Sequence, residues 1–370
     1  MTVRVALAQP RDASYGILIG RGLLADLPAL VKAACPAGRY AVITDSQVAK
    51  LYAEKLVARC RGAGLQVELL EFPAGERSKT RETWERLSDR MLAAQLGRDS
   101  AVIALGGGVV GDVAGFVAAT YLRGIPCIQV PTTLLAMIDS SIGGKTGVDV
   151  PAGKNLLGAF HQPQLVVADL DALGSLPAPQ FAAGMAEAVK HGVIADRPYF
   201  DALEQDHRAV TAREPEALER VVRRSVEIKA EVVGADEREA GRRAILNFGH
   251  TVAHAIEATS KFATLHGEAV AIGMAHEARL AEALGIAEAG TADRLQRLLE
   301  RYALPLELPR SATVDDLMAA MQLDKKAREG TVRFALPQAI GRMYADGKNW
   351  TVAAPKDVVR DLLGGGGRRA

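Results

Sequence analysis

The fold is decided by the stretch Ala101–Asp112 (AVIALGGGVVGD), in which an apolar run leads directly into three glycines. Its first part, Ala101–Leu105, has the length and composition of a buried strand. The glycines fit the pattern G-x-G-x-x-G between a strand and a helix, where backbone N–H groups can approach a pyrophosphate. The stretch therefore predicts a nucleotide-binding turn, although any tight turn between a strand and a helix also favours glycine.

Outward from this turn, strand-like runs alternate with helical patterns through the first half of the chain. This alternation predicts a mostly parallel sheet with helices on both faces. The predicted strands are Val3–Leu7, Gly16–Ile19, Tyr40–Thr44, Gln66–Leu70, Ala101–Leu105, Cys127–Val130 and Leu165–Ala168. The predicted helices are Leu23–Ala34, Gln47–Arg61, Lys79–Leu96 and Val110–Thr120.

Near Pro177 the pattern changes from alternation to one helix after another. The predicted helices are Pro179–Ile194, Pro198–Glu204, Pro215–Val233, Ile245–Thr259, His266–Ala283, Thr291–Arg301 and Val314–Met321, and the only predicted strand is Thr331–Leu336. We therefore expect an α/β domain over residues 1–176 and an all-α domain over residues 177–363. Residues 364–370, which are rich in glycine, are expected to form a disordered tail.

Composition and charge exclude several classes of protein. The 370 residues exceed what one core usually serves, and 49% are hydrophobic and 24% charged, as in ordinary globular proteins. The net charge of +1 provides no field that would attract nucleic acid or a membrane. Three cysteines without close spacing, no signal-peptide pattern and no apolar run of about 20 residues favour a cytoplasmic protein.

The glycine turn departs from the usual dinucleotide fingerprint. It comes late in the chain, and no acidic residue stands about 20 residues further on along the next strand. Asp45, at the end of an earlier strand, could bind the ribose instead, and so could Glu76 in the loop before a helix. Ser78 in that loop could equally be a helix N-cap. Thr132 and Thr133 add hydroxyl groups at another strand end, where α/β sheets bind ligands.

A basic, glycine-rich linker, Asp139–Gly147, precedes a second polar segment, Gly153–Asn155. Gly144-Lys145-Thr146 resembles the end of a phosphate loop, but Asp139 stands where that motif requires glycine. The lysines and the exposed glycine backbone would still suit a phosphate or a carboxylate. A solvated loop is the alternative.

Histidines in the helical half predict a metal site. His250 and His254 are spaced i and i+4 and share a helix face, while His266 begins the next helix and Glu187 lies on an earlier one. Thr251 follows His250, so the general base of the H-E-x-x-H metalloproteases is missing. Two imidazoles and one carboxylate would suit Zn²⁺ or a similar ion and leave positions open for substrate. Ordinary core or surface histidines are the alternative.

These segments together resemble the 3-dehydroquinate synthase family. The matching motifs are Gly106–Asp112, Tyr121–Gly124, Pro131–Ala136, Asp139–Thr146, Gly153–Asn155 and Leu246–Thr251, and the resemblance runs from about residue 15 to about residue 345. It implies a fold like that of glycerol dehydrogenases, with an N-terminal NAD-binding α/β domain and a C-terminal helical metal domain. It also implies a homodimer.

The resemblance implies a role for each matching residue. The ligands of a divalent metal, Zn²⁺ or Co²⁺, would be Glu187, His250 and His266. NAD would contact Asp45, Glu76, Lys79, Gly107, Gly108, Val109, Asp112, Thr132, Thr133, Lys145, Lys154 and Ser175. Catalysis and substrate binding would use Asp139, Lys145, Lys154, Asn155, Lys190, Lys229, Arg243, Asn247 and Lys326. Arg123 would reach the site of the partner subunit, and His254 would serve in a proton relay rather than as a ligand.

The implied reaction turns 3-deoxy-D-arabino-heptulosonate 7-phosphate into 3-dehydroquinate and phosphate, by transient oxidation with NAD, β-elimination of phosphate, re-reduction and aldol closure. Two alternatives within the sugar phosphate cyclases are 2-deoxy-scyllo-inosose synthase and the epi-valiolone synthases, which share this chemistry. A third alternative is an oxidoreductase like glycerol dehydrogenase. The several lysines expected to bind anions argue against that third alternative, because glycerol carries no phosphate.

Overall fold

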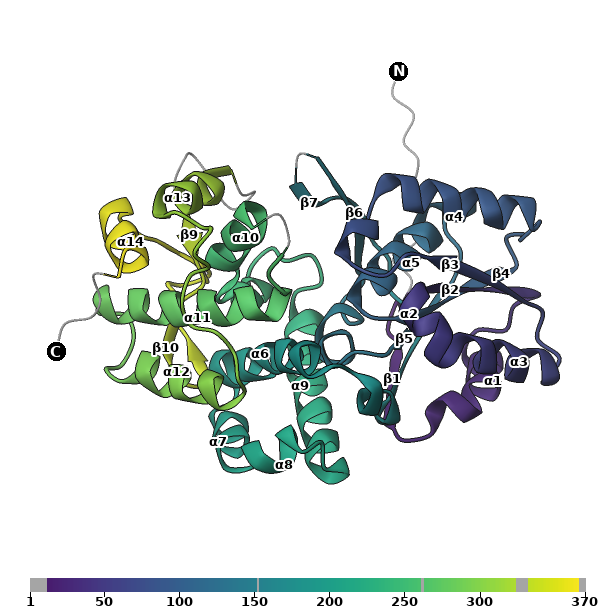
Figure 1. The fold of residues 1–370 in the computed structure, drawn as a ribbon, viewed down its shortest axis with the longest axis horizontal. Coiled ribbons are helices and arrows are strands. Elements are labelled where there is room, and N and C mark those ends of the chain that lie inside the picture. The colour runs from purple at the N-terminus through teal and green to yellow at the C-terminus, as the bar shows by residue number, and fades with distance from the viewer. Residues whose placement is uncertain (1–11, 152, 261–262, 324–331, 366–370) are drawn as a thin grey trace, which may run out of the picture.

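The computed structural model describes residues 12–151, 153–260, 263–323 and 332–365. Figure 1 shows two lobes side by side, one built on a sheet covered by helices and one made mostly of helices. The predicted strand Val3–Leu7, the candidate Lys326 and residues 366–370 of the predicted tail lie outside the described residues.

The sheet of the first lobe has six parallel strands in the order β1-β8-β5-β4-β2-β3. The strands are β1 (Gly16–Gly20), β2 (Arg39–Asp45), β3 (Val67–Phe72), β4 (Ser100–Gly106), β5 (Cys127–Pro131) and β8 (Leu165–Asp169). The helices of this lobe are α1 (Leu23–Ala34), α2 (Ser46–Val48), α3 (Glu54–Gly62), α4 (Arg81–Ala93) and α5 (Gly108–Thr120). The chain adds strands outward from β2 to β3 and then returns to place β4 on the other side of β2.

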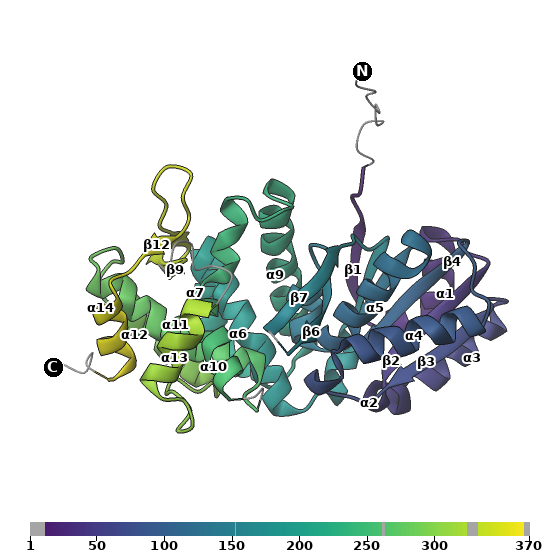
Figure 2. The ribbon, with the colours of Figure 1, turned by 90° about the horizontal axis from the view of Figure 1, so that it is seen from above.

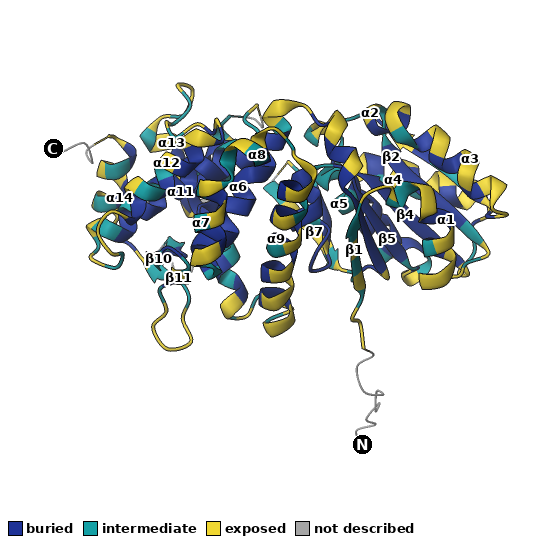
Figure 3. Cartoon of the chain, turned by 90° about the horizontal axis from the view of Figure 1, so that it is seen from below, coloured by how far each residue is buried: buried dark blue, intermediate teal, exposed yellow. Residues whose placement is uncertain are grey.

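Helices cover both faces of this sheet (Figure 2). Val42 and Ile103 point to one face and pack in a cluster with residues of α1 and α3. Their neighbours Ile43 and Ala104 point to the opposite face and pack with residues of α4 and α5. Since successive side chains of a strand alternate between faces, a strand that is apolar at every position must be covered on both sides. The central strands β4 and β5 are accordingly dark along their length in Figure 3.

The end of the predicted linker and the polar segment after it form an antiparallel hairpin of β6 (Lys145–Val150) and β7 (Gly153–Phe160), packed against α5. Alternating small and β-branched residues in β6 explain the strand, which the glycine content obscured. The outer strand β7 leaves Leu156 and Leu157 exposed, at 37% and 42%. This part of the chain is therefore a paired hairpin with exposed apolar side chains, not an irregular loop.

The second lobe is mostly helical, which confirms the predicted fold class. Its helices are α6 (Ala178–Ala195), α7 (Arg197–Gln205), α8 (His207–Thr211), α9 (Pro215–Ala235), α10 (His250–Thr259), α11 (His266–Ala283), α12 (Thr291–Arg301), α13 (Val314–Leu323) and α14 (Lys356–Leu363). Two short antiparallel pairs accompany them: β9 (Arg333–Phe334) with β12 (Val352–Ala353), and β10 (Pro337–Ala339) with β11 (Arg342–Met343). None of the helices in the described part of the chain is long and apolar enough to cross a membrane.

The predicted helix Ile245–Thr259 starts later than expected. A separate 3-10 turn covers Arg242–Asn247, and α10 begins at His250. The reason is Gly249, whose φ of +81° belongs to the left-handed region and breaks the helix. The break places His250 at the first position of a helix. The division into domains at residue 177 remains a prediction.

Candidate functional site

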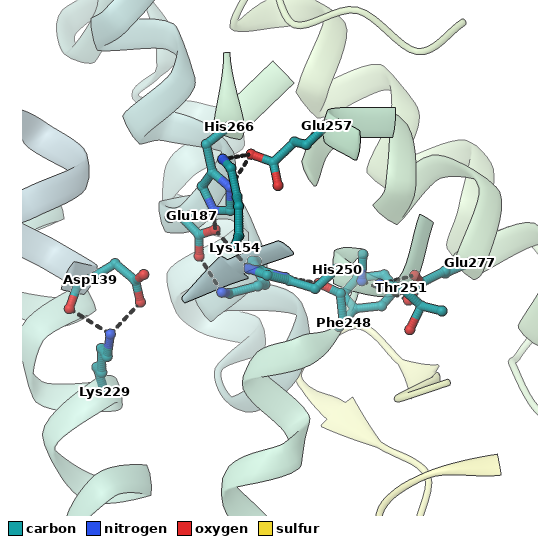
Figure 4. Close-up of polar contacts among 12 residues, drawn as sticks. Asp139, Lys154, Glu187, Lys229, Phe248, His250, Thr251, Glu257, His266 and Glu277 are labelled. Atoms are coloured by element: carbon teal, nitrogen blue, oxygen red, sulfur yellow. Dashed lines mark hydrogen bonds and ion pairs between the residues drawn. The ribbon is translucent and has the colours of Figure 1, made fainter. Parts of the chain in front are cut away.

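Three side chains from three helices converge in the second lobe (Figure 4). Glu187 lies on α6 and is fully buried. Its Oε1 atom is 3.7 Å from Nε2 of His250 and 3.6 Å from Nε2 of His266. All three potential ligand atoms lie within 4.8 Å of one another. The structure thus brings together the residues that the sequence predicted as metal ligands.

The geometry of this group fits a small divalent cation. Two ligands that are each about 2.1 Å from a tetrahedral zinc ion lie roughly 3.4 Å apart. The observed distances of 3.6 and 3.7 Å are close to that spacing and too long for hydrogen bonds. Oε1 of Glu187 is buried and has no hydrogen-bond partner. A cation at this point would satisfy an atom that the protein leaves unsatisfied.

Glycines allow the three helices to approach one another. A Cβ atom at Gly267 would lie 2.0 Å from the carbonyl oxygen of Ala183 on α6. A Cβ atom at Gly273 would lie 1.9 Å from the carbonyl oxygen of Gly249, just before α10. Because any side chain at these two positions would separate the helices, glycine at both is required to bring His266 and His250 to Glu187.

His250 is oriented by the start of its helix. Its Nδ1 atom lies 3.1 Å from the carbonyl oxygen of Phe248, which can only accept a hydrogen bond, so Nδ1 carries the proton and Nε2 is left to face Glu187. The buried carboxylate of Glu277 on α11 accepts bonds from the backbone N–H groups of Gly249 at 2.7 Å and Thr251 at 3.0 Å. Glu277 thereby caps α10 and fixes the position of its first residue.

His266 belongs to a chain of charged groups that crosses between the lobes. Its Nδ1 atom lies 3.2 Å from Oε1 of Glu257, and the same oxygen is 3.0 Å from Nζ of Lys154. Lys154 also lies 3.0 Å from Oε1 of Glu76, at the predicted nucleotide side. Burial by itself would lower the pKa of His266, but the carboxylates of Glu257 and Glu187 raise the pKa to about 10.

The remaining predicted histidine, His254, is a neighbour of this group. Its ring packs edge to face against that of His250, with the centroids 5.6 Å apart. It does not belong to the group of converging ligand atoms, which contains His250 and His266 from different helices. The i, i+4 pair therefore contains one member of the converging group, His250, and one adjacent residue, His254.

A second cluster lies beside the first and carries its own cations. Asp139 accepts a hydrogen bond from Lys229 at 2.5 Å, and Lys190 forms an ion pair with Glu187. Burial alone would raise the pKa of Asp139, but Lys229 and Lys190 hold it well below its usual range. His191 is fully buried here, and burial together with Lys190 lowers its pKa to about 3. Asp139, Glu187 and His191 also bring potential ligand atoms within 4.8 Å of one another, but two ammonium groups already neutralise the two carboxylates, so this cluster attracts a cation less strongly than the first group.

The other predicted substrate contacts are engaged with oxygen atoms of the protein. Lys145 forms an ion pair with Glu239, and Asn247 donates to the same carboxylate at 2.6 Å. Arg243 is buried and donates to the carbonyl oxygens of Glu237 and, at 3.1 Å, Gly143. These donors are held in place by acceptors that an anionic ligand could replace.

The predicted nucleotide contacts follow the carboxyl ends of the parallel strands. Asp45 ends β2, Gly107 follows β4, and Thr132 and Thr133 follow β5. The direction in which the chain adds strands reverses between β2 and β4. Open α/β sheets bind their ligands at such a topological switch point. Gly107 stands directly before α5, so the free N–H groups at the start of that helix face the same edge.

The nucleotide edge also contains engaged side chains. Asp45 accepts bonds from the backbone of Gln47 and Val48 and caps α2. Lys79 is buried, and its Nζ atom lies 2.5 Å from Oδ2 of Asp112 on α5. Burial by itself would lower the pKa of Lys79, but the carboxylates of Asp112 and Glu76 raise it. Ser175 lies 2.6 Å from the hydroxyl of Tyr52. Gly108 and Val109 form the first turn of α5.

Two predicted site residues, Arg123 and Asn155, are exposed. Arg123 lies in a turn after α5, where Leu122, Arg123 and Gly124 all have positive φ. Asn155 is exposed on β7 and donates its backbone N–H to Asp149 at 2.8 Å.

Three glutamates at the site were not predicted from the sequence. Glu239 and Glu257 contact predicted site residues, and Glu277 caps the helix that carries His250. A signal was available for Glu257, which follows His250 by seven residues and therefore lies on the same face of α10.

Family models and similar sequences point to the same family. Profiles described as 3-dehydroquinate synthase N-terminal and 3-dehydroquinate synthase C-terminal match residues 69–183 and 184–327. The 3-dehydroquinate synthase of Symbiobacterium thermophilum is 54% identical over 334 residues, which cover 90% of this chain and 93% of that protein.

Two solved structures are similar over nearly the whole chain. The 2-epi-5-epi-valiolone synthase of Streptomyces hygroscopicus subsp. jinggangensis, with NAD⁺ and Zn²⁺ bound, is 32% identical with a TM-score of 0.87 and covers 98% of both chains. A 2-deoxy-scyllo-inosose synthase complexed with carbaglucose-6-phosphate, NAD⁺ and Co²⁺ is 28% identical with a TM-score of 0.86. That match covers 94% of this chain and 95% of the other.

Proposed function

Since this chain belongs to the 3-dehydroquinate synthase family, we propose that it converts 3-deoxy-D-arabino-heptulosonate 7-phosphate into 3-dehydroquinate and inorganic phosphate. The observation that carries the proposal is the convergence of Glu187, His250 and His266 beside buried lysine and arginine side chains. The first group suits a divalent cation, and the second suits a substrate with a carboxylate and a phosphate. Loss of phosphate breaks a carbon–oxygen bond without net oxidation, so the enzyme would be a lyase.

NAD and a divalent cation, Zn²⁺ or Co²⁺, are the cofactors of this proposal. Both solved relatives described above carry NAD⁺ with one of these ions. When bound, the two groups would supply reversible hydride removal from a ring alcohol and polarisation of its oxygen. Glu187, His250 and His266 would hold the cation, and the carboxyl edge of β2, β4 and β5 would hold NAD.

The chain's own residues would bind and orient the substrate anion. Lys190 pairs with Glu187 and Lys229 pairs with the neighbouring Asp139, so an anion bound by these lysines would be held next to the cation site. Asp139, whose pKa is lowered by these lysines, would remain ionised and keep both ammonium groups in place. Lys145 and Asn247 would exchange Glu239 for the substrate. His254, adjacent to His250, would hold or move a proton near the reacting carbon.

The test is an assay with two simultaneous readings. The protein is incubated with the heptulosonate phosphate and a catalytic amount of NAD⁺, and phosphate release and NADH absorbance are followed together. Phosphate release without lasting NADH supports the proposal, because NAD is restored in each turnover. Accumulating NADH would instead identify a dehydrogenase. Inactivity on this substrate, with turnover of glucose 6-phosphate or sedoheptulose 7-phosphate, would assign the chain to one of the related cyclases.

The active form is proposed to be a homodimer, with Arg123 directed toward the partner subunit. The exposed Leu156 and Leu157 on β7 support an interface at the hairpin, because a second copy would remove them from water. Sedimentation equilibrium should give the dimer mass, and Leu157→Lys should weaken the association. A wild-type chain that sediments as a monomer at assay concentrations would contradict this part of the proposal.

The proposed location is the cytoplasm. Cys35, Cys60 and Cys127 are all buried and form no disulfide. Free thiols are typical of proteins from a reducing compartment. Cell fractionation with an antibody against the chain would test this expectation.

A further inference from the structure

We propose that Glu257 is a positioning residue of the metal centre, which orients His266 so that its Nε2 atom faces the cation. This inference rests on the proposed metal site at Glu187, His250 and His266. It adds a residue that was not predicted from the sequence and that does not itself reach the cation site.

The two nitrogen atoms of the His266 ring face different carboxylates. Nδ1 lies 3.2 Å from Oε1 of Glu257, and Nε2 lies 3.6 Å from Oε1 of Glu187. An ionised carboxylate only accepts hydrogen bonds, so the proton of His266 belongs on Nδ1 when a cation is at Nε2. Carboxylate–histidine–metal arrangements of this kind fix the tautomer and the orientation of the ring and increase the basicity of the ligand.

Glu257 is itself held in place from two directions. Its side chain is nearly fully buried and lies on α10, the helix that precedes α11 with His266. Lys154 on β7 lies 3.0 Å from the same oxygen that faces His266. The ammonium group keeps the carboxylate charged in a buried position, where an unpaired charge would be costly. Glu257 therefore contacts both His266 and Lys154, and the contact with Lys154 of the first lobe holds its carboxylate in position.

A purely structural role is the competing explanation, in which Glu257 serves only as the ion-pair partner of Lys154. The two explanations differ in what a loss of the carboxylate changes. A structural role affects the stability of the metal-free protein. A positioning role affects the affinity for the cation and the ligand field around it, even where stability is preserved.

The experiment uses the full chain after removal of metal and titrates it with Co²⁺ in competition with a chelator. Glu257→Ala should bind Co²⁺ roughly 10- to 100-fold more weakly than wild type and should change the visible absorption spectrum of the bound ion. Glu257→Gln keeps an acceptor oxygen for Nδ1, so its affinity should lie between those of wild type and Glu257→Ala. Thermal unfolding of each metal-free protein controls for stability.

Glu268→Gln is the matched control. Glu268 lies two residues after His266, and its carboxylate accepts a bond from the backbone of Leu265 at 3.0 Å. Gln serves the same capping position, so Co²⁺ affinity and spectrum should stay close to those of wild type. Wild-type affinity and an unchanged spectrum in both Glu257 variants would overturn the positioning role.

The outcomes also separate this inference from the proposed function. Wild-type protein that binds Co²⁺ but releases no phosphate from the heptulosonate would refute the proposed reaction, while the comparison of Glu257 variants would still decide the positioning role. Wild-type protein that binds no divalent cation would overturn the metal centre and the role of Glu257 together.

Discussion

The nucleotide edge and the metal cluster are built in different ways. Along the edge, the predicted contacts lie immediately after strands β2, β4 and β5, and much of the surface they offer is backbone. The metal cluster takes one side chain from each of α6, α10 and α11 and depends on the approach of those helices. A site at strand ends follows from sheet topology, whereas a site between helices follows from packing. The two regions should therefore respond differently to substitution.

The largest effect is expected at the metal cluster. His250→Ala removes one of three ligands and should abolish stable metal binding and activity, because two ligands from different helices retain a cation poorly. Metal content after dialysis and turnover are the measurements. Circular dichroism should show most of the fold intact, since His250 lies at the first position of its helix. A variant with full metal content and turnover would refute the assigned ligand.

The next effect concerns the buried charges beside that cluster. Lys229→Met leaves Asp139 without its closest cation and should lower the free energy of unfolding by about 3 kcal/mol at neutral pH. Methionine is neutral and unbranched, so the variant removes the charge while keeping much of the side chain's packing. Urea denaturation of the metal-free protein provides the measurement. An unfolding free energy equal to that of wild type would contradict the expected loss.

This loss should depend on pH. In wild type the pKa of Asp139 is lowered, so its ionisation stabilises the fold above the ordinary carboxyl pKa, and this contribution is lost as the pH falls through the lowered value. Loss of Lys229 raises that pKa relative to wild type. The difference between the two proteins should therefore shrink as the pH falls from about 7 to about 4. A difference that stays constant would show that Asp139 is not the affected group.

A smaller effect is expected at the nucleotide edge. A Cβ atom at Gly107 would lie 3.1 Å from Cγ2 of Thr133, so Gly107→Val crowds the turn before α5. We expect NAD⁺ to bind about tenfold more weakly, a difference of about 1.4 kcal/mol. Calorimetric titration with NAD⁺ measures this change, and Co²⁺ affinity serves as the control. Equal losses in both affinities would mean that the two regions are not independent.

The smallest effect is expected where the first lobe meets the segment before α6. Tyr52→Phe removes the contact between its hydroxyl and Ser175 at 2.6 Å and should cost about 1 kcal/mol of stability. Chemical denaturation followed by fluorescence would measure it. If Ser175 also contacts NAD, the affinity for NAD⁺ should fall slightly in the same variant. An unfolding free energy equal to that of wild type would contradict a stabilising role for the hydroxyl contact.

Strands β2, β4 and β8 were predictable because each contains an uninterrupted apolar run, followed by glycine or a polar group. Val42 and Ile43 show why, since one packs against α1 and α3 and the other against α4 and α5. The hairpin of β6 and β7 was not predictable in the same way. Its glycines and lysines resemble those of a loop, and only pairing with the opposite strand and packing on α5 make it regular.

The sequence by itself determined the alternation of strands and helices and the glycine turn at the end of β4, because these depend on periodicity and residue type. It also supplied Glu187, His250, His254 and His266 as candidates for a metal site. Tertiary structure alone decided which histidines converge on Glu187 and which carboxylates surround them. Glu257 and Glu277 acquire their contacts only when α10 and α11 pack together, and that packing depends on close approaches at Gly267 and Gly273. Distances between groups far apart in the chain are properties of packing, which no local pattern encodes.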